Sequence, residues 1–247
     1  MACAGLTEQG DRLPAAIAAV AGDRPFRLVW RNELGGLTFE VGAGDDRWFA
    51  KWAPAASGLD LAGEAARLRW AGRYTSVPGV LDQGADHTGA WLLTSPLPGE
   101  SAVSRAGWPR LALRCGRSGR DCGRFTTAFR PRSARSAGRS ATASSGRAGP
   151  AGAQAPQSAY PPSVDRLVVC HGDPCSPNTL MHEDGRWSGH VDMDALGVAD
   201  RWADLAVATW STVWNYGPGW EGTLLDAYGI SLDRERTSFY RKLWELT

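Results

Sequence analysis

One loop and the hairpin that follows it constrain this chain more than any other part of its sequence. The apolar run at 167–170 predicts a strand, which delivers Asp173 into the loop His-Gly-Asp-Pro-Cys-Ser-Pro-Asn that ends at Asn178. Residues 179–191 then predict two strands around the turn Glu-Asp-Gly-Arg. This hairpin brings Asp192 back beside Asn178.

The loop and the hairpin therefore gather Asp173, Asn178 and Asp192 at one strand end. Phosphoryl transfer needs such a set, because a base orients the attacking hydroxyl and two oxygen ligands hold magnesium on the nucleotide phosphates. The structural alternative is an acidic loop with an Asx-turn at Asp173 and a surface hairpin. The segment 197–206, in which Asp200 stands at the position of a helix N-cap, favours the catalytic interpretation.

These residues resemble the signature of the aminoglycoside phosphotransferases, small-molecule kinases related in fold to protein kinases. That signature reads H-G-D-x-x-x-x-N, then D, then G-x-x-D-R-x-x-D-[LI]-A. One departure is Asp194, which replaces a glycine two residues after Asp192, and glycine adopts positive φ more readily. The resemblance implies that Asp173 is the catalytic base and that Asn178 and Asp192 bind Mg²⁺. The block 168–178 is most similar to the streptomycin 3″-phosphotransferase branch.

The N-terminal part predicts an antiparallel five-stranded sheet with one helix. Residues rich in β-branched and aromatic side chains alternate with turn residues, and one stretch has helical spacing. The predicted strands are 26–30, 38–41, 47–52, 80–84 and 90–94, and the helix is 61–70. The turn at Gly35 and Gly36 can lay backbone N–H groups over nucleotide phosphates. Taken alone, a glycine pair also fits a simple hairpin turn.

Lys51 and Glu64 are the candidate phosphate-positioning pair. Lys51 is one of two lysines in the chain, against twenty-five arginines, and Glu64 lies thirteen residues later on the predicted helix. Kinases use such a Lys–Glu pair to hold the ATP phosphates, and the resemblance places the pair here. The proline-rich stretch 96–100 predicts an extended hinge. In the family this hinge contacts adenine, which implies that Thr94 and Leu97 flank the base.

The C-terminal part predicts helices over 204–214, 220–228 and 233–244. Acidic residues there are candidates to bind a cationic acceptor, and the chain-terminal carboxylate can join them. These candidates are Asp200, Glu221, Asp226 and Thr247. Ordinary solvated charges are the alternative for each of them. Twelve tryptophans are scattered along the chain, a distribution that favours core positions over a ligand cage.

The whole chain predicts an α+β, protein-kinase-like, two-lobed fold. The expected parts are an N-terminal nucleotide lobe (1–95), a hinge (96–100), an aberrant segment (101–163) and a mostly helical catalytic lobe with the hairpin (164–247). No apolar run of eighteen residues predicts a membrane span, and the N-terminus does not resemble a secretory signal. Five cysteines without a CxxC pair argue against disulfides and zinc. A reduced cytoplasmic protein is expected.

Residues 101–160 have a composition unlike the rest of the chain. They hold eleven arginines and one acidic residue, whereas the remainder holds sixteen basic and twenty-five acidic residues. The segment contains two leucines in sixty residues, so it predicts too little apolar surface to offset chain ordering. An RNA-binding role is disfavoured, because the arginines lack aromatic interleaving and helical phase.

A slip in the reading frame accounts for this composition. When the codons of residues 113–130 are read one nucleotide earlier, Cys122 becomes leucine in every case and Thr126 becomes histidine or tyrosine. The shifted codons permit Leu-Arg-Ala-Leu-His, an amphipathic pattern similar to the L-x-x-L-H element of the family. We predict a slip that begins near 106–113 and is corrected by about Ser163. The chain as written is then expected to fold poorly and to be weakly active or inactive.

The sequence as a whole predicts an ATP- and Mg²⁺-dependent kinase of an aminoglycoside, streptomycin at its 3″ hydroxyl, which would give antibiotic resistance. An acidic body suits a polycationic substrate and neither nucleic acid nor a membrane. Kinases of choline, homoserine or ketosamines share the His-Gly-Asp triplet and remain alternatives. A catalytically inactive binding protein, or a frame-damaged member of the family, is the alternative outside active enzymes.

Overall fold

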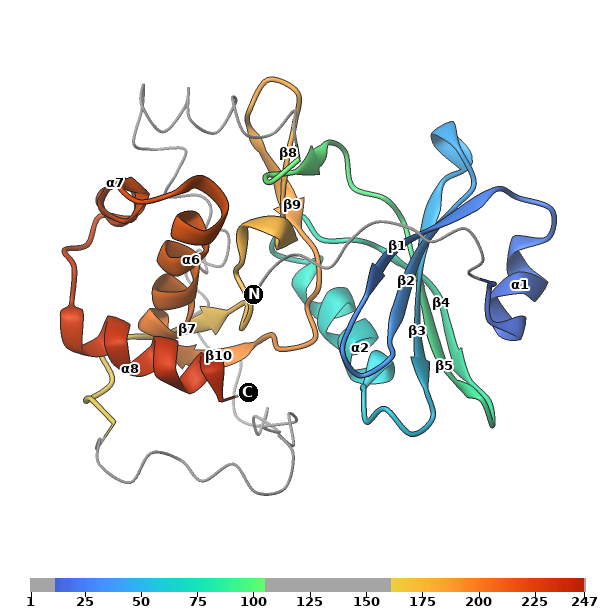
Figure 1. The fold of residues 1–247 in the computed structure, drawn as a ribbon, viewed down its shortest axis with the longest axis horizontal. Coiled ribbons are helices and arrows are strands. Elements are labelled where there is room, and N and C mark those ends of the chain that lie inside the picture. The colour runs from blue at the N-terminus through green and yellow to red at the C-terminus, as the bar shows by residue number, and fades with distance from the viewer. Residues whose placement is uncertain (1–11, 105–160, 247) are drawn as a thin grey trace. The chain divides into compact units, whose positions relative to one another are not determined.

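The structure of the protein is a computed structural model that describes residues 12–104 and 161–246. The chain divides into two compact units, each described separately. Unit 1 comprises residues 1–73 and 77–97, and unit 2 comprises residues 74–76 and 98–247. The contact boundary near Leu97 falls inside the proline-rich stretch that the sequence predicts as a hinge. Both units combine helices with antiparallel strands, so the predicted α+β class is observed (Figure 1).

Unit 1 is built on an antiparallel five-stranded sheet with the strand order β1-β2-β3-β5-β4. The strands and helices are α1 (Ala15–Ala21), β1 (Phe26–Arg31), β2 (Leu37–Val41), the 3₁₀ turn η1 (Gly44–Asp46), β3 (Trp48–Pro54), α2 (Leu61–Ala71), β4 (Val80–Ala85) and β5 (Gly89–Thr94). The sequence predicts each of the five strands and the helix α2 within about two residues. The short helix α1 was not predicted.

Successive side chains of β2 point to opposite faces of the sheet, so the two faces differ. Phe39 and Val41 are fully buried and pack with Ile17 of α1 and Leu93 of β5. Burying these side chains stabilises the sheet, since each large apolar side chain contributes about 1.5–3 kcal/mol. Thr38, one residue from Phe39, points to the opposite face and pairs with Lys51 of β3 across the ladder.

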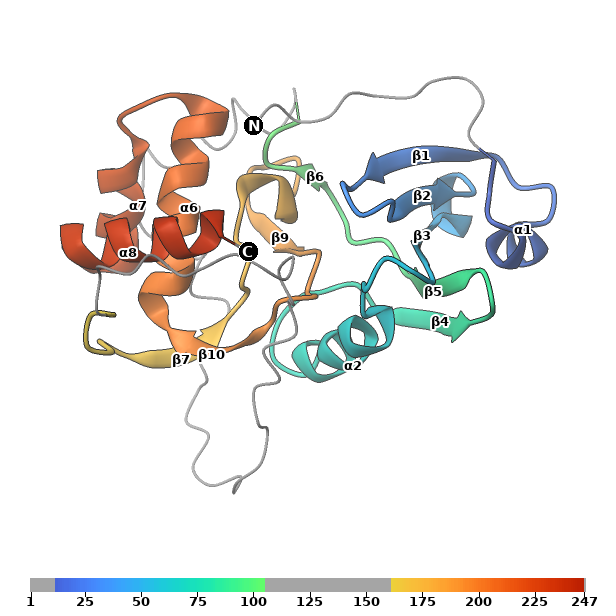
Figure 2. The ribbon, with the colours of Figure 1, turned by 60° about the horizontal axis from the view of Figure 1, so that its bottom comes forward.

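The helix α2 packs against β3, β4 and β5, and Figure 2 shows it beside the sheet. It begins where the carboxylate of Asp60 accepts a hydrogen bond from Gly63 N (2.8 Å), a side-chain N-cap. Leu61, Ala65 and Leu68 form its buried face at helical spacing. Glu64 lies on this same buried side, which fixes the direction of its carboxylate.

The described residues of unit 2 form a small ribbon, a three-stranded sheet and three helices. Its elements are β6 (Glu100–Ser101), β7 (Leu167–Cys170), η2 (Ser176–Asn178), β8 (Thr179–Met181), β9 (Trp187–His190), β10 (Gly197–Asp200), α6 (Arg201–Tyr216), α7 (Trp220–Tyr228) and α8 (Arg234–Glu245). The strand β7 pairs with β10, and β8 lies between β6 and β9. The predicted hairpin is therefore present as β8 and β9, around the turn at 183–186.

The helix α6 forms the centre of unit 2, where α7 and α8 pack against it (Figures 1 and 2). Trp202, Leu205 and Ala208 of α6 are buried against Leu224 and Leu225 of α7. Gly229 ends α7 in the left-handed conformation (φ 83°, ψ 38°), as the sequence predicts for a glycine C-cap. In the two described stretches, no helix is both long and apolar enough to cross a lipid bilayer.

Candidate active site

The loop after β7 is held in place from within unit 2 by a buried carboxylate. Asp204 of α6 accepts hydrogen bonds from His171 N (2.7 Å) and Gly172 N (3.0 Å) through its two oxygens. Burial raises the pKa of Asp204, and the two backbone donors oppose that rise by favouring the charged form. Gly172 has φ 90°, and a Cβ there would lie 2.5 Å from Ala195, so only glycine fits this turn.

The imidazole of His171 fixes the next turn of the loop. Its Nδ1 accepts a hydrogen bond from Asp173 N (3.2 Å), and its Nε2 lies 3.0 Å from Val191 O. These partners require the tautomer that carries its proton on Nε2. The same ring thus ties the loop to the residue that precedes Asp192. On the other side, Ser176 N donates to Ser211 Oγ of α6 (2.8 Å).

Asp173 and Asn178 are brought together as the sequence predicts. The amide Nδ2 of Asn178 donates to Asp173 O (3.0 Å) and to Asp173 Oδ2 (3.2 Å), which leaves the amide oxygen of Asn178 facing away from this bond. Asp173 Oδ1 is out of contact with solvent and has no hydrogen-bond partner among the described residues. An unsatisfied buried acceptor of this kind fits a hydroxyl donor or a cation.

Asp192 lies beside this pair through the backbone. Val191 N donates to Asn178 O (3.0 Å), so the residue after Val191 reaches the loop. Asp192 has φ 65°, and it is the one non-glycine residue with positive φ in the described stretches. Asp194, which replaces the glycine usual in the family, is not among the positive-φ residues, so the departure noted in the sequence does not require a left-handed backbone at that position.

The chemistry of these donors fits magnesium. Asn178 offers an amide oxygen and Asp192 a carboxylate, which are the ligand types that Mg²⁺ prefers. Within residues 12–104 and 161–246, no three His, Cys, Asp or Glu side chains are grouped as a metal site. The set here has two carboxylates and one amide, which suits an ion that keeps several waters and takes further oxygens from phosphates.

Cys175 lies within the same loop but is not a nucleophile. Burial, followed by the negative charges of Asp173 and Asp192, raises the pKa of the Cys175 thiol far above its usual range. A thiol in such surroundings stays protonated at neutral pH and is inert.

In unit 1, Lys51 and Glu64 meet as predicted. Lys51 Nζ lies 2.6 Å from Glu64 Oε1, and the Glu64 side chain is 3% exposed whereas that of Lys51 is 25% exposed. The carboxylate is thus fixed inside the unit, and the ammonium group is the part that reaches its surface. Thr94 is buried at the end of β5 beside Phe49 of β3, and Leu97 is partly buried at the end of the unit.

The glycine turn differs from its prediction. Gly35 N donates to Asn32 O (3.2 Å), and Gly36 N donates to Asn32 Oδ1 (2.7 Å). Both amides are therefore used inside the turn and do not face outward for a phosphate. A Cβ at Gly36 would lie 2.7 Å from Asn32 Nδ2, so close approach of this side chain explains the glycine. The signal for this arrangement is Asn32, which forms an Asx-turn.

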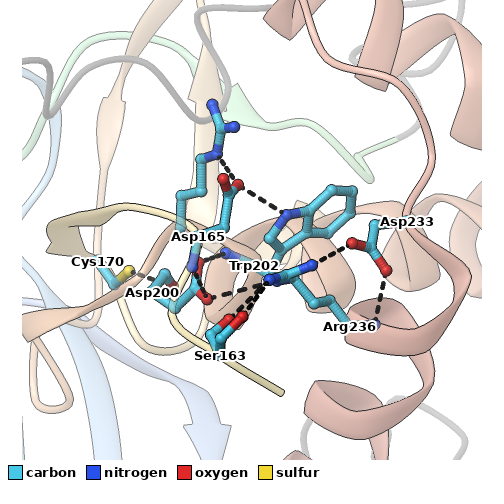
Figure 3. A network of polar contacts seen from close by, with 8 residues as sticks. Ser163, Asp165, Cys170, Asp200, Trp202, Asp233 and Arg236 are labelled. Carbon is cyan, nitrogen blue, oxygen red and sulfur yellow. Dashed lines mark hydrogen bonds and ion pairs between the residues drawn. The ribbon is translucent and has the colours of Figure 1, made fainter.

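Asp200 is a structural residue and not a substrate ligand (Figure 3). Its carboxylate accepts hydrogen bonds from Asp165 N (2.9 Å) and from Trp202 N (3.2 Å), and the residue is 3% exposed. It caps α6 as predicted, but a carboxylate with both oxygens used inside the fold cannot bind a polycation. Arg201 Nε lies 2.6 Å from Asp165 Oδ2, and this bond lowers the pKa of Asp165.

The other acidic candidates have different positions. Glu221 forms an ion pair with Arg241 of α8, whereas Asp226 is exposed on α7. Thr247 lies outside the described residues. Sequence reasoning missed the residues that hold the loop, which are His171, Asp204 and Ser211. Asp204 stands in the quoted D-R-x-x-D pattern, so its spacing from Asp200 was a usable signal for it.

Buried His190 gives unit 2 a predicted dependence on pH. Burial and the neighbouring His171 lower the pKa of His190 from 6.5 to about 3. Between these values the unfolded chain binds a proton that the folded chain does not, so stability falls as pH drops below about 6.5. We expect the thermal midpoint of a His190→Gln variant to fall less steeply between pH 7 and 5 than that of the parent. The control is exposed His87→Gln, which should keep the parent's slope.

The comparisons with known proteins follow this geometry. A family model described as "Phosphotransferase enzyme family" matches residues 31–240. The chain belongs to this family. Within it, the chain is 33% identical to an aminoglycoside 3′-phosphotransferase of Streptomyces fradiae, over 89% of this chain and 94% of that protein. It is also 33% identical to a streptomycin 3″-kinase of Streptomyces griseus, over 92% and 93% of the two chains.

Solved structures agree with the family assignment. The crystal structure of an aminoglycoside 3′-phosphotransferase of type VIII has a TM-score of 0.64 and 25% identity, over 94% of this chain and 97% of that one. A phosphotransferase of Streptomyces rimosus, also solved in complex with ADP and streptomycin, has a TM-score of 0.60 and 23% identity in that complex, with 94% and 96% covered. The kinase-like fold predicted from the sequence is therefore confirmed, and the chain is a phosphotransferase enzyme.

Proposed function

We propose that this phosphotransferase moves the γ-phosphate of ATP to the 3″ hydroxyl of streptomycin. The observation that carries the proposal is the gathering of Asp173, Asn178 and Asp192 around one loop, with an unsatisfied buried oxygen on Asp173. Asp173 Oδ1 accepts the proton of the acceptor hydroxyl and orients its oxygen toward the phosphorus atom. Placement and charge stabilisation then supply most of the catalysis, since phosphoryl transfer needs little covalent chemistry from the protein.

In unit 1, the residues that we assign to the nucleotide are Lys51 with Glu64, and Thr94 with Leu97. Lys51, kept in place by Glu64, neutralises the phosphates, and Thr94 and Leu97 flank the adenine. Asn178 and Asp192 hold magnesium, which supplies positive charge against the phosphate oxygens when it is bound. A lysine suits the first role, because its compact ammonium can contact a carboxylate and a phosphate together.

A polycationic acceptor suits unit 2, whose residues 161–246 include thirteen acidic and seven basic side chains. Summed negative charge raises the local concentration of a cation and increases its association rate. The relatives support two acceptor positions, because a 3′-phosphotransferase and a streptomycin 3″-kinase are equally identical to this chain. Phosphorylation of a 3′ hydroxyl is therefore the second candidate function.

A panel of acceptors tests the proposal. We expect ATP-dependent phosphorylation of streptomycin, with the phosphate located at the 3″ oxygen by NMR of the product. The KM for streptomycin should rise with added salt, because screening shortens the reach of each charge to about 8–10 Å near physiological ionic strength. Kanamycin, which offers a 3′ hydroxyl, is the arm for the second candidate. Transfer to choline or homoserine without transfer to any aminoglycoside would refute both candidates.

A further inference from the structure

Three tryptophans of unit 2 form an aromatic cluster at its surface. Trp210 and Trp214 of α6 have ring centroids 4.6 Å apart, and Trp244 of α8 lies 5.5 Å from Trp214 and 6.4 Å from Trp210. The sequence predicts core positions for the tryptophans, and Trp202 is indeed 2% exposed. Trp214, in contrast, is 45% exposed although it belongs to a cluster. We name the three rings the tryptophan platform.

We propose that the tryptophan platform binds an aminated ring of the acceptor and so determines which acceptor the enzyme takes. This inference rests on the proposed function and deepens it, since it assigns a subsite to the cationic substrate. The ligand class is a saturated ring that bears protonated amino or guanidino groups. Such rings bind indole through their C–H faces and through cation–π attraction, for which tryptophan is the best aromatic partner.

The platform shares the helix α6 with Ser211, which supports the loop that carries Asp173. Ser211 of α6 holds the loop at Ser176 N, and Asn215 Nδ2 donates to Ser211 O (2.8 Å). On an α-helix each residue turns by about 100°, so Trp214 projects about 60° away from Ser211 and one turn further along. The helix face that supports the phosphoacceptor loop and the face that carries the platform are therefore adjacent.

The platform already binds one cation inside the fold. The guanidinium carbon of Arg241 lies 5.4 Å from the centroid of the Trp210 ring, and the same guanidinium forms an ion pair with Glu221. Arg241 Nε also donates to Ala206 O (3.1 Å), which fixes the arginine on α6. This contact places a guanidinium over the face of Trp210, whereas the exposed ring surface belongs to Trp214. Glu245, the residue after Trp244, is exposed.

The test is the effect of Trp214→Leu on steady-state kinetics of the full chain. Leucine keeps apolar bulk and removes the aromatic face, so we expect the KM for streptomycin to rise about five- to thirtyfold. The KM for ATP and the thermal midpoint should stay at the parent values. Trp214→Phe retains an aromatic face and should recover most of the lost affinity. An unchanged streptomycin KM in Trp214→Leu would overturn the proposal.

The matched control is Trp70→Leu, because Trp70 is a helical tryptophan of similar exposure (40%) on α2 of unit 1. This variant should leave the streptomycin KM unchanged. If another part of the chain covers the platform, Trp214→Leu will lower the thermal midpoint without changing that KM, and the proposal is again overturned. A parent protein that melts cooperatively, and so is folded, but phosphorylates no aminoglycoside refutes the proposed function instead. An active parent with an insensitive Trp214 refutes the platform alone.

Discussion

The Asp173→Asn variant is expected to lose phosphoryl transfer by a factor of about 10²–10⁴, the range that general base catalysis contributes. Asparagine has the same shape as aspartate, so the hydrogen bonds of Asn178 to residue 173 can persist. Asp173 Oδ1 has no hydrogen-bond partner in the described part of the chain and is the atom assigned as the base. The asparagine side chain cannot accept the proton of the hydroxyl in its place. The loss should appear in kcat for streptomycin, with the KM for ATP nearly unchanged. Asp173→Ala should be inactive.

Two further variants make this result specific. Asp184→Ala removes an exposed carboxylate from the turn of the same hairpin and should retain parental turnover. Asp192→Ala should weaken nucleotide binding in a manner that added magnesium relieves, because this residue is assigned to the cation and not to the hydroxyl. If Asp173→Asn kept more than about a tenth of the parental kcat, a loss smaller than general base catalysis supplies, Asp173 would not be the base.

The elements of this fold were predictable wherever local spacing determines them. Strand alternation in 38–41, the helical spacing of Leu61, Ala65 and Leu68, and the glycine after Tyr228 are all local signals. The site residues Asp173, Asn178 and Asp192 were also predictable, because one loop and one short hairpin bring them together. Their convergence needs a chain closure of only about twenty residues, which costs little entropy.

The support of the loop was not predictable from local spacing, since it depends on residues more than thirty positions away. Asp204 accepts hydrogen bonds from two loop amides, and Ser211 accepts one from a third. The D-R-x-x-D spacing marks Asp204 without showing what it binds, and Ser211 has the pattern of an ordinary residue of an amphipathic helix. The predicted role of Asp200 as a substrate ligand failed for the same reason. The N-cap role of Asp200 was predictable from the sequence, but the second hydrogen bond that its carboxylate accepts, from Asp165 N, depends on a tertiary contact.

The glycine turn shows a different failure. The pair Gly35–Gly36 was interpreted as a phosphate-binding turn because backbone N–H groups favour anions. Asn32 accepts hydrogen bonds from both amides, so they are not available to an anion. The shorter of the two bonds, 2.7 Å, runs from Gly36 N to the side-chain oxygen of Asn32. A short polar side chain near a glycine pair therefore changes what the pair can bind.

Correcting the reading frame of the gene from near residues 106–113 to about Ser163 is the second change with a large expected effect. Residues 105–160 lie outside the described residues, but exposed apolar side chains in the described part of unit 2 bear on this prediction. Leu167 and Val198 of the β7–β10 ribbon are 63% and 60% exposed, and Val164 is 57% exposed. An apolar ribbon surface of this kind usually lies under another element. A helix with the leucine spacing of the shifted frame has a suitable apolar face.

The point at which the frame returns is also consistent with the contacts. Arg236 of α8 donates a hydrogen bond to Ser163 O (2.7 Å). The carboxylate of Asp165 accepts hydrogen bonds from Arg201 Nε and from the indole N–H of Trp202 (Figure 3). From Ser163 onward the chain thus makes specific contacts with residues 200–202 and with α8. This supports a restoration of the native frame by about Ser163, which the sequence alone predicts from the family pattern that resumes at Leu167.

We therefore expect the frame-corrected protein to melt cooperatively, at a higher midpoint than the chain as written, and to phosphorylate streptomycin at least about tenfold faster. The reason is that burying three or four leucine-sized side chains stabilises a domain by about 1.5–3 kcal/mol each, comparable to the total stability of a typical protein. Calorimetry and turnover of the two proteins, prepared side by side, measure the difference. The catalytic residues are identical in both, so a gain in turnover reports on folding and not on chemistry. Equal thermal midpoints and equal turnover in the two proteins would show that residues 105–160, as written, belong to a folded and active enzyme.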